Sequence, residues 1–364
     1  AHVKLIDATP IGINVRSTVA TYAGVHDELR KLYAKSPDAK EHGYKANDFS
    51  YNTGSLRCPG CDGTGVVSLD VQFLPDVNIP CPDCRGSRYA RAAYGVKLMN
   101  KAGENASLPE LMDMDVNSAI EFCADRKTVS QKLGILKQLG LGYLTLDRSA
   151  STLSTGERQR MQLARAVRNR TTGVLYVLDE PSIGLHPSNI VGLTGVMHDL
   201  VADGNSVILV DHDTQILKEA DWIVEMGPEA GAKGGHVIAE GNIPMIEENS
   251  NSQIGPFLSG KAETKLRERA KKDELFANGT LHLSTSQIHT VKPLEVDIPK
   301  GRFTVVTGVS GSGKTTMVLE SLVPALEAKI NGNPLPAHIR SVEADGIAHV
   351  KLIDATPIGI NVRS

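Results

Sequence analysis

Residues 308–316 read Gly308-Val-Ser-Gly-Ser-Gly-Lys-Thr-Thr316, which fits the pattern G-x-x-x-x-G-K-[ST]. The apolar stretch FTVVTG leads into this segment, and the helix-compatible stretch MVLESLVPAL follows it. A strand, a glycine-rich loop and a helix in this order direct backbone N–H groups and the positive end of a helix dipole at a phosphate group. The sequence therefore predicts a phosphate-binding loop between a strand and a helix. An ordinary glycine-rich turn is the alternative.

The chemistry of such a loop assigns a role to each of its side chains. Lys314 is expected to reach the β- and γ-phosphates of ATP, and the Thr315 hydroxyl is expected to bind Mg²⁺. The other residues expected to surround the phosphates are Gly308, Ser310, Gly311, Ser312, Gly313 and Thr316.

A second candidate half of an ATP site lies far upstream, in the apolar stretch LYVLDE of residues 175–180. Parallel strands deliver functional groups at their carboxyl ends. Asp179 is therefore expected to hold Mg²⁺ through its water shell, and Glu180 to polarise the attacking water. Many buried strands end in an acid, so this motif alone is a weak signal.

Residues 153–157, LSTGE, resemble the LSGGE signature of ABC ATPases, with Thr155 in place of the first glycine. The resemblance implies that Ser154 and Gly156 cap a γ-phosphate held by the phosphate loop of another cassette. Together with the other motifs it implies an ABC-type α/β core with a helical signature subdomain.

Two further segments resemble ABC motifs that follow the acidic strand. Residues 210–213, VDHD, resemble the switch-histidine segment, which implies that His212 contacts the γ-phosphate and senses hydrolysis. A lone histidine at a strand end is ordinarily just a polar residue, but its spacing from Asp179 and Glu180 favours the functional interpretation. Residues 181–187, PSIGLHP, resemble the loop that joins two cassettes.

Four of the five cysteines form two C-x-x-C pairs, with 19 residues between the pairs: Cys58, Cys61, Cys81 and Cys84. This spacing is typical of zinc sites, and four thiolates leave no open coordination position, so a structural zinc ion is predicted. The zinc repeats of DnaJ chaperones share the local pattern, but they occur four times and without a signature or phosphate loop. Cys123 is predicted to be a buried small apolar residue.

Nearly the whole chain resembles the UvrA family of bacterial nucleotide excision repair. DATPIGINVRS is similar to the family's DQSPIGRTPRS, and ATYAGVHDELRKLYA is similar to ATYTGVFDDIRELFA. The resemblance implies an ATPase that binds damaged double-stranded DNA as a dimer, with ATP, Mg²⁺ and Zn²⁺ as cofactors. The lack of a recognisable signal peptide or membrane-length apolar run predicts a cytoplasmic location. A UvrB-like helicase subunit is a further implied partner, although its docking region is not recognisable in this chain.

The chain departs from the family pattern at the glutamine of the Q-loop, where Ala8 and Ala355 stand. This change removes a polar side chain beside Mg²⁺ and the attacking water, and so concerns the hydrolysis rate more than nucleotide binding. Alanine at this position is similar to the UvrA-related proteins of drug resistance, and a role in drug resistance is therefore one alternative function. The second alternative is that the chain is a non-enzymatic fragment.

The two ends of the chain are identical, since residues 1–17 and 348–364 both read AHVKLIDATPIGINVRS. The phosphate loop also follows the signature, whereas in one cassette it comes first. Joining the chain into a circle at the repeat restores the usual order. A tandem fragment, a circular permutation and an error of sequence assembly all fit this pattern. Both copies cannot fill the same place in one domain, so at least one end is predicted to be displaced or unpaired.

The charge balance restricts how the chain meets nucleic acid. Lys and Arg total 39 against 42 for Asp and Glu, a net charge of −3, so a DNA surface must be a local patch. No apolar run approaches the roughly 20 residues of a membrane helix, and no signal peptide is recognisable. The candidate DNA-contacting residues are Arg16, Lys45, Arg57, Arg85, Arg88 and Arg91, interleaved with Tyr51 and Tyr89.

The predicted organisation has five parts. They are the Q-loop region of an ABC cassette at 1–50, a zinc-binding insertion at 51–106, a signature subdomain with the acidic strand and switch histidine at 107–245, a linker at 246–276 and the phosphate-loop (Walker A) part at 277–364.

Apolar periodicity predicts the main secondary structure elements, with a parallel sheet from the alternation of strands and helices. The predicted strands are 2–6, 173–180, 206–213 and several within 279–307, and the predicted helical stretches are 25–34, 107–146 and 190–203.

Overall fold

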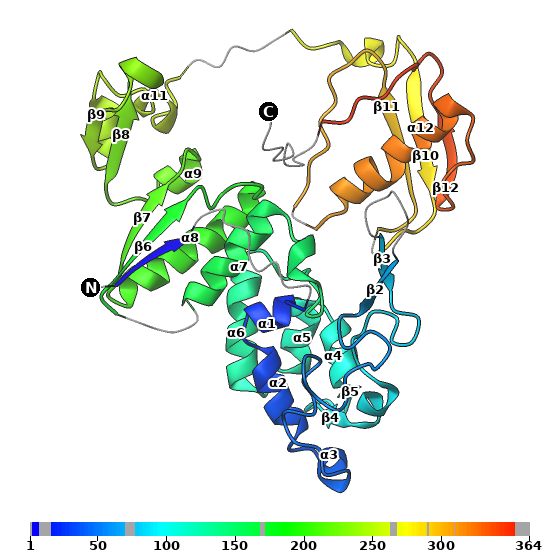
Figure 1. Ribbon diagram of the computed structural model, residues 1–364. Helices are drawn as coiled ribbons and strands as arrows, with labels where there is room; N and C mark the ends of the chain where they lie inside the picture. Colours follow the sequence, from blue (N-terminus) through cyan, green and yellow to red (C-terminus); the bar gives the residue numbers. More distant parts are fainter. Residues whose placement is uncertain are drawn as a thin grey trace. The chain divides into compact units, whose positions relative to one another are not determined.

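The computed structural model divides the chain into two compact units, Ala1–Ala262 and Glu263–Ser364 (Figure 1). The residues that it describes are 2–6, 16–69, 77–167, 172–262, 268–289, 291–309 and 311–353. Among these residues, no helix is both long enough and apolar enough to cross a membrane.

The first unit contains a parallel three-stranded sheet in the order β1 (His2–Ile6), β6 (Val174–Asp179) and β7 (Ser206–Val210). One face packs against α7 (Thr155–Val167) and α8 (Pro187–Ala202), as Figure 1 shows. The alternating side chains of β6 on this face are buried, as period-2 patterning requires. The predicted strands at 2–6, 173–180 and 206–213 and their parallel arrangement are confirmed.

Helices form the larger part of the core of the first unit. They include α1 (Val19–Tyr22), α2 (His26–Tyr33) and α3 (Pro37–Glu41), followed later in the chain by α4 (Leu108–Asp113), α5 (Val116–Phe122) and α6 (Lys127–Gln138). The stretch predicted to be helical at 107–146 is thus three helices. Asp115 divides the first two, because its side chain accepts a hydrogen bond from Ser118 N–H and caps α5. Gly140, at φ 69°, follows the end of α6, where a glycine in the left-handed region commonly ends a helix.

The region rich in cysteine and glycine forms short elements between α3 and α4. The strands β2 (Val66–Leu69) and β3 (Val77–Pro80) pair antiparallel, and β4 (Lys97–Met99) pairs with β5 (Asn105–Ser107) after the short helix η1 (Arg91–Gly95). Another short helix, η2 (Ala150–Thr152), precedes α7.

The last part of the first unit has a small core of its own. Its elements are α9 (Thr214–Leu217), β8 (Ile223–Gly227), η3 (Gly231–Lys233), β9 (His236–Gly241), α10 (Ile243–Glu248) and α11 (Gly255–Leu258). Ile246 and Leu258 are buried against Ile223 and Ala239 of the β8–β9 hairpin. The predicted linker at 246–276 therefore begins too early, because scattered apolar residues within this polar stretch anchor it to the hairpin.

The second unit is an antiparallel sheet in the order β11 (Leu294–Pro299), β10 (Thr280–Thr285) and β12 (Ile339–Glu343), preceded by η4 (Lys272–Glu274). The predicted helix after the phosphate loop is present as a π-helical turn, η5 (Thr316–Leu322), that continues into α12 (Val323–Asn331). Buried Leu283, Ala325 and Leu326 join this helix to the sheet.

The prediction of a strand that leads into the phosphate loop is wrong for this unit. Residues 303–308 form no strand, and the Phe303 side chain is 95% exposed. A segment with this apolar alternation needs a neighbouring strand and a core beneath it. The described residues of the unit use β10, β11 and β12 for their own core.

Candidate nucleotide and zinc sites

The phosphate loop lies in the second unit and has the backbone that its glycines predict. Gly311 and Gly313 adopt φ of 77° and 90°, the left-handed region that glycine occupies without strain. At Gly308 a Cβ atom would lie 2.7 Å from Ser312 Oγ. The Lys314 ammonium donates hydrogen bonds to the carbonyl oxygens of Gly308 (2.7 Å) and Val309 (2.8 Å), so its charge lies against the start of the loop.

The remaining side chains of the loop lie at the start of the following helix. Thr315 is exposed, and Thr316 Oγ1 donates a hydrogen bond to Glu320 Oε1 at 3.1 Å. Ser310 lies outside the described residues, as do Ala8 and Ala355 of the two Q-loop segments.

The acidic residues of the first unit lie at the carboxyl edge of its parallel sheet. Asp179 is the last residue of β6 and lies opposite Val210 of β7. The Glu180 N–H donates to the Val210 carbonyl oxygen at 2.8 Å, and Glu180 has φ of 47°. His212 Nδ1 lies 4.0 Å from Glu180 Oε1, with both side chains accessible to solvent. The structure therefore places Asp179, Glu180 and His212 at the ends of adjacent strands, with the Glu180 and His212 side chains close to each other.

Asp211 holds the loops after β6 and β7 together, a role that the sequence analysis missed. Its carboxylate accepts hydrogen bonds from the Ser182 hydroxyl (2.8 Å) and from the backbone N–H groups of His212 (2.8 Å) and Asp213 (3.0 Å). A carboxylate directly after a strand and beside the candidate histidine was the available signal. These bonds fix the backbone from which the His212 side chain projects.

The signature segment forms the N-terminus of α7. Ser154 Oγ accepts a hydrogen bond from the Glu157 N–H, and the Ser154 N–H donates to Glu157 Oε2 at 2.7 Å, which is the reciprocal arrangement of a capping box. Tyr143 donates a short hydrogen bond to Glu157 Oε1. Burial acts to raise the pKa of Glu157, but these hydrogen bonds outweigh it and lower the pKa below its ordinary value.

Contacts within the first unit also join the signature to the acidic edge. The Gln159 side-chain amide of α7 donates to the backbone carbonyl of Asp179. At Gly156, a Cβ atom would lie 2.3 Å from the Ile183 carbonyl oxygen in the PSIGLHP segment. A glycine is therefore required for this close approach. Lys314 and Thr315 belong to the other unit, so the two halves of the predicted nucleotide site lie in separate units of the chain.

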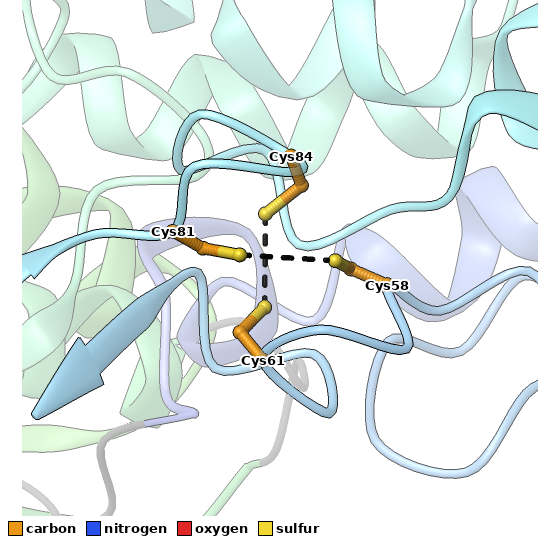
Figure 2. Close-up of side chains that lie close together, drawn as sticks. All are labelled: Cys58, Cys61, Cys81 and Cys84. Carbon is orange, nitrogen blue, oxygen red and sulfur yellow. Dashed lines mark hydrogen bonds between the residues drawn. The ribbon is translucent and has the colours of Figure 1, made fainter.

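The four paired cysteines converge on one point, as Figure 2 shows. The Sγ atoms of Cys58 and Cys81 lie 4.0 Å apart, and those of Cys61 and Cys84 lie 3.6 Å apart. Tetrahedral Zn²⁺ with Zn–S bonds of about 2.3 Å requires sulfur separations of about 3.8 Å. The cluster therefore fits a structural zinc ion.

Burial and hydrogen bonds act in opposite directions on the thiols of this cluster. Burial raises the pKa of Cys84 to about 12. Burial acts to raise the pKa of Cys61 as well, but hydrogen bonds from the Gly65 N–H and the neighbouring thiols outweigh it and lower the pKa to about 7. Bound zinc would deprotonate all four ligands outright. The fifth cysteine, Cys123, is fully buried, as predicted, and burial raises its pKa to about 11.

The structure corrects part of the candidate DNA surface. Tyr51 and Tyr89 are core residues: the Tyr89 hydroxyl donates to the Phe49 carbonyl at 3.0 Å, and Tyr51 lies beneath the Arg88 guanidinium. Arg88 is itself buried. Rings flanking zinc ligands serve here as packing for the module, so they are not available for stacking on bases.

The other candidate DNA-contacting residues differ in whether their side chains form ion pairs within the protein. Arg16 and Arg57 both form ion pairs with Asp62, at 3.0 and 2.9 Å. Lys45, Arg85 and Arg91 are exposed.

Comparison with known proteins identifies the family in which these motifs occur together. The chain is 42% identical to UvrABC system protein A of Streptococcus mutans over 71% of its own length, and 41% identical to that of Thermus thermophilus over 72%. The crystal structure of UvrA2 from Deinococcus radiodurans covers 72% of the chain with a TM-score of 0.65 and 38% identity. Over the matched residues, this chain belongs to the UvrA family. No family model matches it.

The UvrA relationship confirms the predicted fold class, an ABC-type α/β core with a four-cysteine insertion. The chain spans 27% of the length of the two curated UvrA relatives and 32% of the UvrA2 chain.

Proposed function

We propose that this chain is a UvrA-type ATPase of nucleotide excision repair that binds damaged double-stranded DNA as a dimer. The observation that carries the proposal is the carboxyl edge of the parallel sheet, where Glu180 and His212 lie 4.0 Å apart beside Asp179. This arrangement places a base for the attacking water, a γ-phosphate sensor and a Mg²⁺ ligand on adjacent strand ends. The conformation of the glycine-rich loop supports ATP binding by the other unit.

In the proposed reaction, Lys314 would neutralise the β- and γ-phosphates, and Thr315 and Asp179 would hold Mg²⁺ directly or through water. Glu180 accepts the proton of the attacking water as it adds to the γ-phosphate, and ADP leaves. Ser154 and Gly156 cap the γ-phosphate of another cassette at the N-terminus of α7, where the helix dipole favours an anion. His212 responds to the loss of that phosphate.

The proposed zinc ion has a structural role. Cys58, Cys61, Cys81 and Cys84 would close its coordination shell, so it supplies rigidity to the two cysteine loops. The exposed cations beside this module, Lys45, Arg85 and Arg91, are proposed to contact DNA phosphates. Lesions share weakened stacking, so DNA deformability is the proposed basis of damage recognition.

The proposal is tested by separating ATP binding from ATP hydrolysis. Glu180→Gln is expected to retain binding of a fluorescent ATP analogue while hydrolysis falls about 100-fold or more, because only the base is lost. Lys314→Ala is expected to lose both. Equal loss of binding in the two variants, or hydrolysis at the wild-type rate in Glu180→Gln, would contradict the assignment.

The DNA part is tested separately, by fluorescence anisotropy with ultraviolet-irradiated and intact duplexes over a range of salt concentrations. Arg85→Glu with Arg91→Glu should weaken binding to both duplexes and lower the salt slope by about two, since each lost phosphate contact removes about one. Lys127→Glu, at an exposed position on α6, is the matched control. An equal effect in the control would exclude a phosphate-contact surface at the zinc module.

A further inference from the structure

The segment His-Val-Lys-Leu-Ile occurs twice in the described part of the chain with two different structures. In the first unit it is β1, which pairs parallel with β6 along its whole length and buries Ile6 to 3% exposure. In the second unit, residues 349–353 are paired with no strand among the described residues, and Ile353 is 94% exposed. Val350 packs partly against the core of that unit, while the other four residues of the segment are exposed.

The edge of β6 makes contacts that either copy satisfies equally well. Lys4 Nζ donates to the Ala166 carbonyl at 3.2 Å and lies 5.2 Å from the centre of the Tyr176 ring, while Ile6 packs into the core. Lys351 and Ile353 are the same residues in the same order. Exchange of one copy for the other therefore leaves the contacts at this edge unchanged, which is the condition for domain swapping.

The same sheet has one apolar face that no described element of the first unit covers. Val3, Leu5, Ile208 and Val210 point to this face and are each more than half exposed. Parallel sheets are ordinarily covered on both faces. Figure 1 shows β1 at the edge of this sheet, with α7 and α8 on its other face.

The second unit carries exposed apolar side chains in its phosphate-loop segment. They are Phe303, Val305, Val306 and Val309. One unit therefore has an uncovered apolar sheet face with a strand position that accepts HVKLI, and the other has an exposed apolar segment together with an unpaired HVKLI.

We propose that residues 349–353 of a second copy of this chain replace β1 beside β6. The exchanged strand runs parallel to β6, with Val350 opposite Leu175 and Leu352 opposite Val177, the register that Val3 and Leu5 have in β1. The exchange tethers the phosphate-loop unit of the second copy to the unit that has the uncovered sheet face. When both copies exchange, the assembly closes as a two-fold dimer.

A second copy fits this position because it carries the identical sequence that the position already accepts. The chain's own residues 349–353 carry it as well, and the crosslinking experiment below distinguishes the two. The pairing needs no nucleotide, so crosslinking tests the exchange separately from the proposed ATPase.

Cysteine crosslinking between differently marked chains tests the exchange. Chains in which Val177→Cys is the one added substitution are mixed with chains in which Leu352→Cys is the one added substitution. The mixture is oxidised after equilibration. A covalent product of twice the chain mass is expected. Chains with Leu335→Cys in place of Leu352→Cys, another exposed leucine of the second unit, are the control for random collision and should give at least 10-fold less product.

A double variant, Leu5→Cys with Val177→Cys, shows that the thiol at 177 reacts with its strand neighbour. It should crosslink within one chain in dilute solution. If this pair reacts while the mixed chains give no more product than the Leu335→Cys control, the exchange is wrong. A Val177→Cys/Leu352→Cys double variant that crosslinks only at the mass of one chain would place the chain's own copy there and would also overturn the proposal.

Deletions give a second measurement that does not depend on cysteines. Removal of residues 349–364 should abolish the dimer in sedimentation velocity experiments without loss of zinc or of helical circular dichroism. Removal of residues 1–6 should instead increase the dimer fraction, because it leaves β6 open to the other copy. A dimer fraction unchanged by both deletions would overturn the exchange.

Discussion

Two pairs of segments in this chain relate sequence to structure in opposite ways. Residues 2–6 and 349–353 have the same sequence, yet one is a parallel strand with Ile6 buried and the other is unpaired with Ile353 exposed. Residues 58–65 and 81–88, CPGCDGTG and CPDCRGSR, agree at only four of eight positions and have nearly the same backbone. Asp62 and Arg85 both have φ of 51°, and the residues two and four beyond each second cysteine match in the same way: Gly63 with Gly86, and Gly65 with Arg88.

The difference between the pairs lies in where the determining contacts come from. A cysteine loop is fixed by its own residues and by one point of convergence, so both loops fold alike. A strand is fixed by its neighbour, so HVKLI becomes a strand only where β6 is available. The predictions below test this contrast, from the largest expected effect to the smallest.

Loss of zinc should have the largest effect, because structural zinc sites contribute about 10–16 kcal/mol of apparent binding free energy. Cys81→Ala is expected to abolish stoichiometric zinc and to unfold both cysteine loops, with exposure of buried Tyr51 and Tyr89. Zinc content by mass spectrometry and tyrosine fluorescence measure the two effects. Cys123→Ala should keep its zinc. A Cys81→Ala protein that lacks zinc but keeps both cysteine loops folded would refute the claim that the ion determines their conformation.

The two copies of HVKLI should respond differently to the same substitution. In the single chain before exchange, Ile6→Ala is expected to lower the free energy of unfolding by about 2–5 kcal/mol because it leaves a cavity in the core. Ile353→Ala should then change it by less than about 0.5 kcal/mol, since that side chain is exposed. Urea titrations of both variants at concentrations where the chain is monomeric provide the comparison. Equal losses in the monomer would contradict the described burial of the two copies.

The two cysteine loops should differ where their surroundings differ. Gly63→Ala places a Cβ atom 1.8 Å from the Tyr51 carbonyl oxygen, whereas Gly86→Ala meets nothing within 4 Å. Both substitutions carry the strain of positive φ, about 1 kcal/mol, so the loss at Gly86 should be of that size and the loss at Gly63 larger, about 3 kcal/mol. Thermal unfolding measures both. A larger loss at Gly86 would contradict the described packing.

The sequence predicted those features that depend on short spacing. The glycine-rich loop, each C-x-x-C pair and each acidic strand end are encoded within a few residues, and their conformations follow from glycine, from thiol convergence and from strand alternation. The features that depend on distant partners were predicted poorly. FTVVTG reads as a strand but meets no neighbour in its unit, and Tyr51 and Tyr89 read as a stacking surface but pack inside the module.

The smallest predicted effect is at the lysines of the two copies. Lys4→Ala removes a hydrogen bond to the Ala166 carbonyl and a contact with the Tyr176 ring, which together contribute about 1 kcal/mol. Lys351→Ala should change the free energy of unfolding by less than about 0.5 kcal/mol. Differential scanning calorimetry of the two variants resolves the difference. These values hold for the monomer. In the exchanged dimer the order reverses, because Lys351 then takes the contacts of Lys4, and a larger loss for Lys351 in the monomer would contradict the described structure.

Complementation of ATPase activity tests the proposed UvrA-type site and the proposed exchange together, because both are required for Lys314 of one copy to act with Glu180 of another. Inactive Lys314→Ala chains are mixed in equal amounts with inactive Glu180→Gln chains, and ATP hydrolysis is measured after equilibration. Exchange predicts that half of the dimers are mixed and that each of these has one intact site, so roughly a quarter of wild-type activity returns. A mixture no more active than its separate components, beside an active wild type, would contradict the claim that the two occur together.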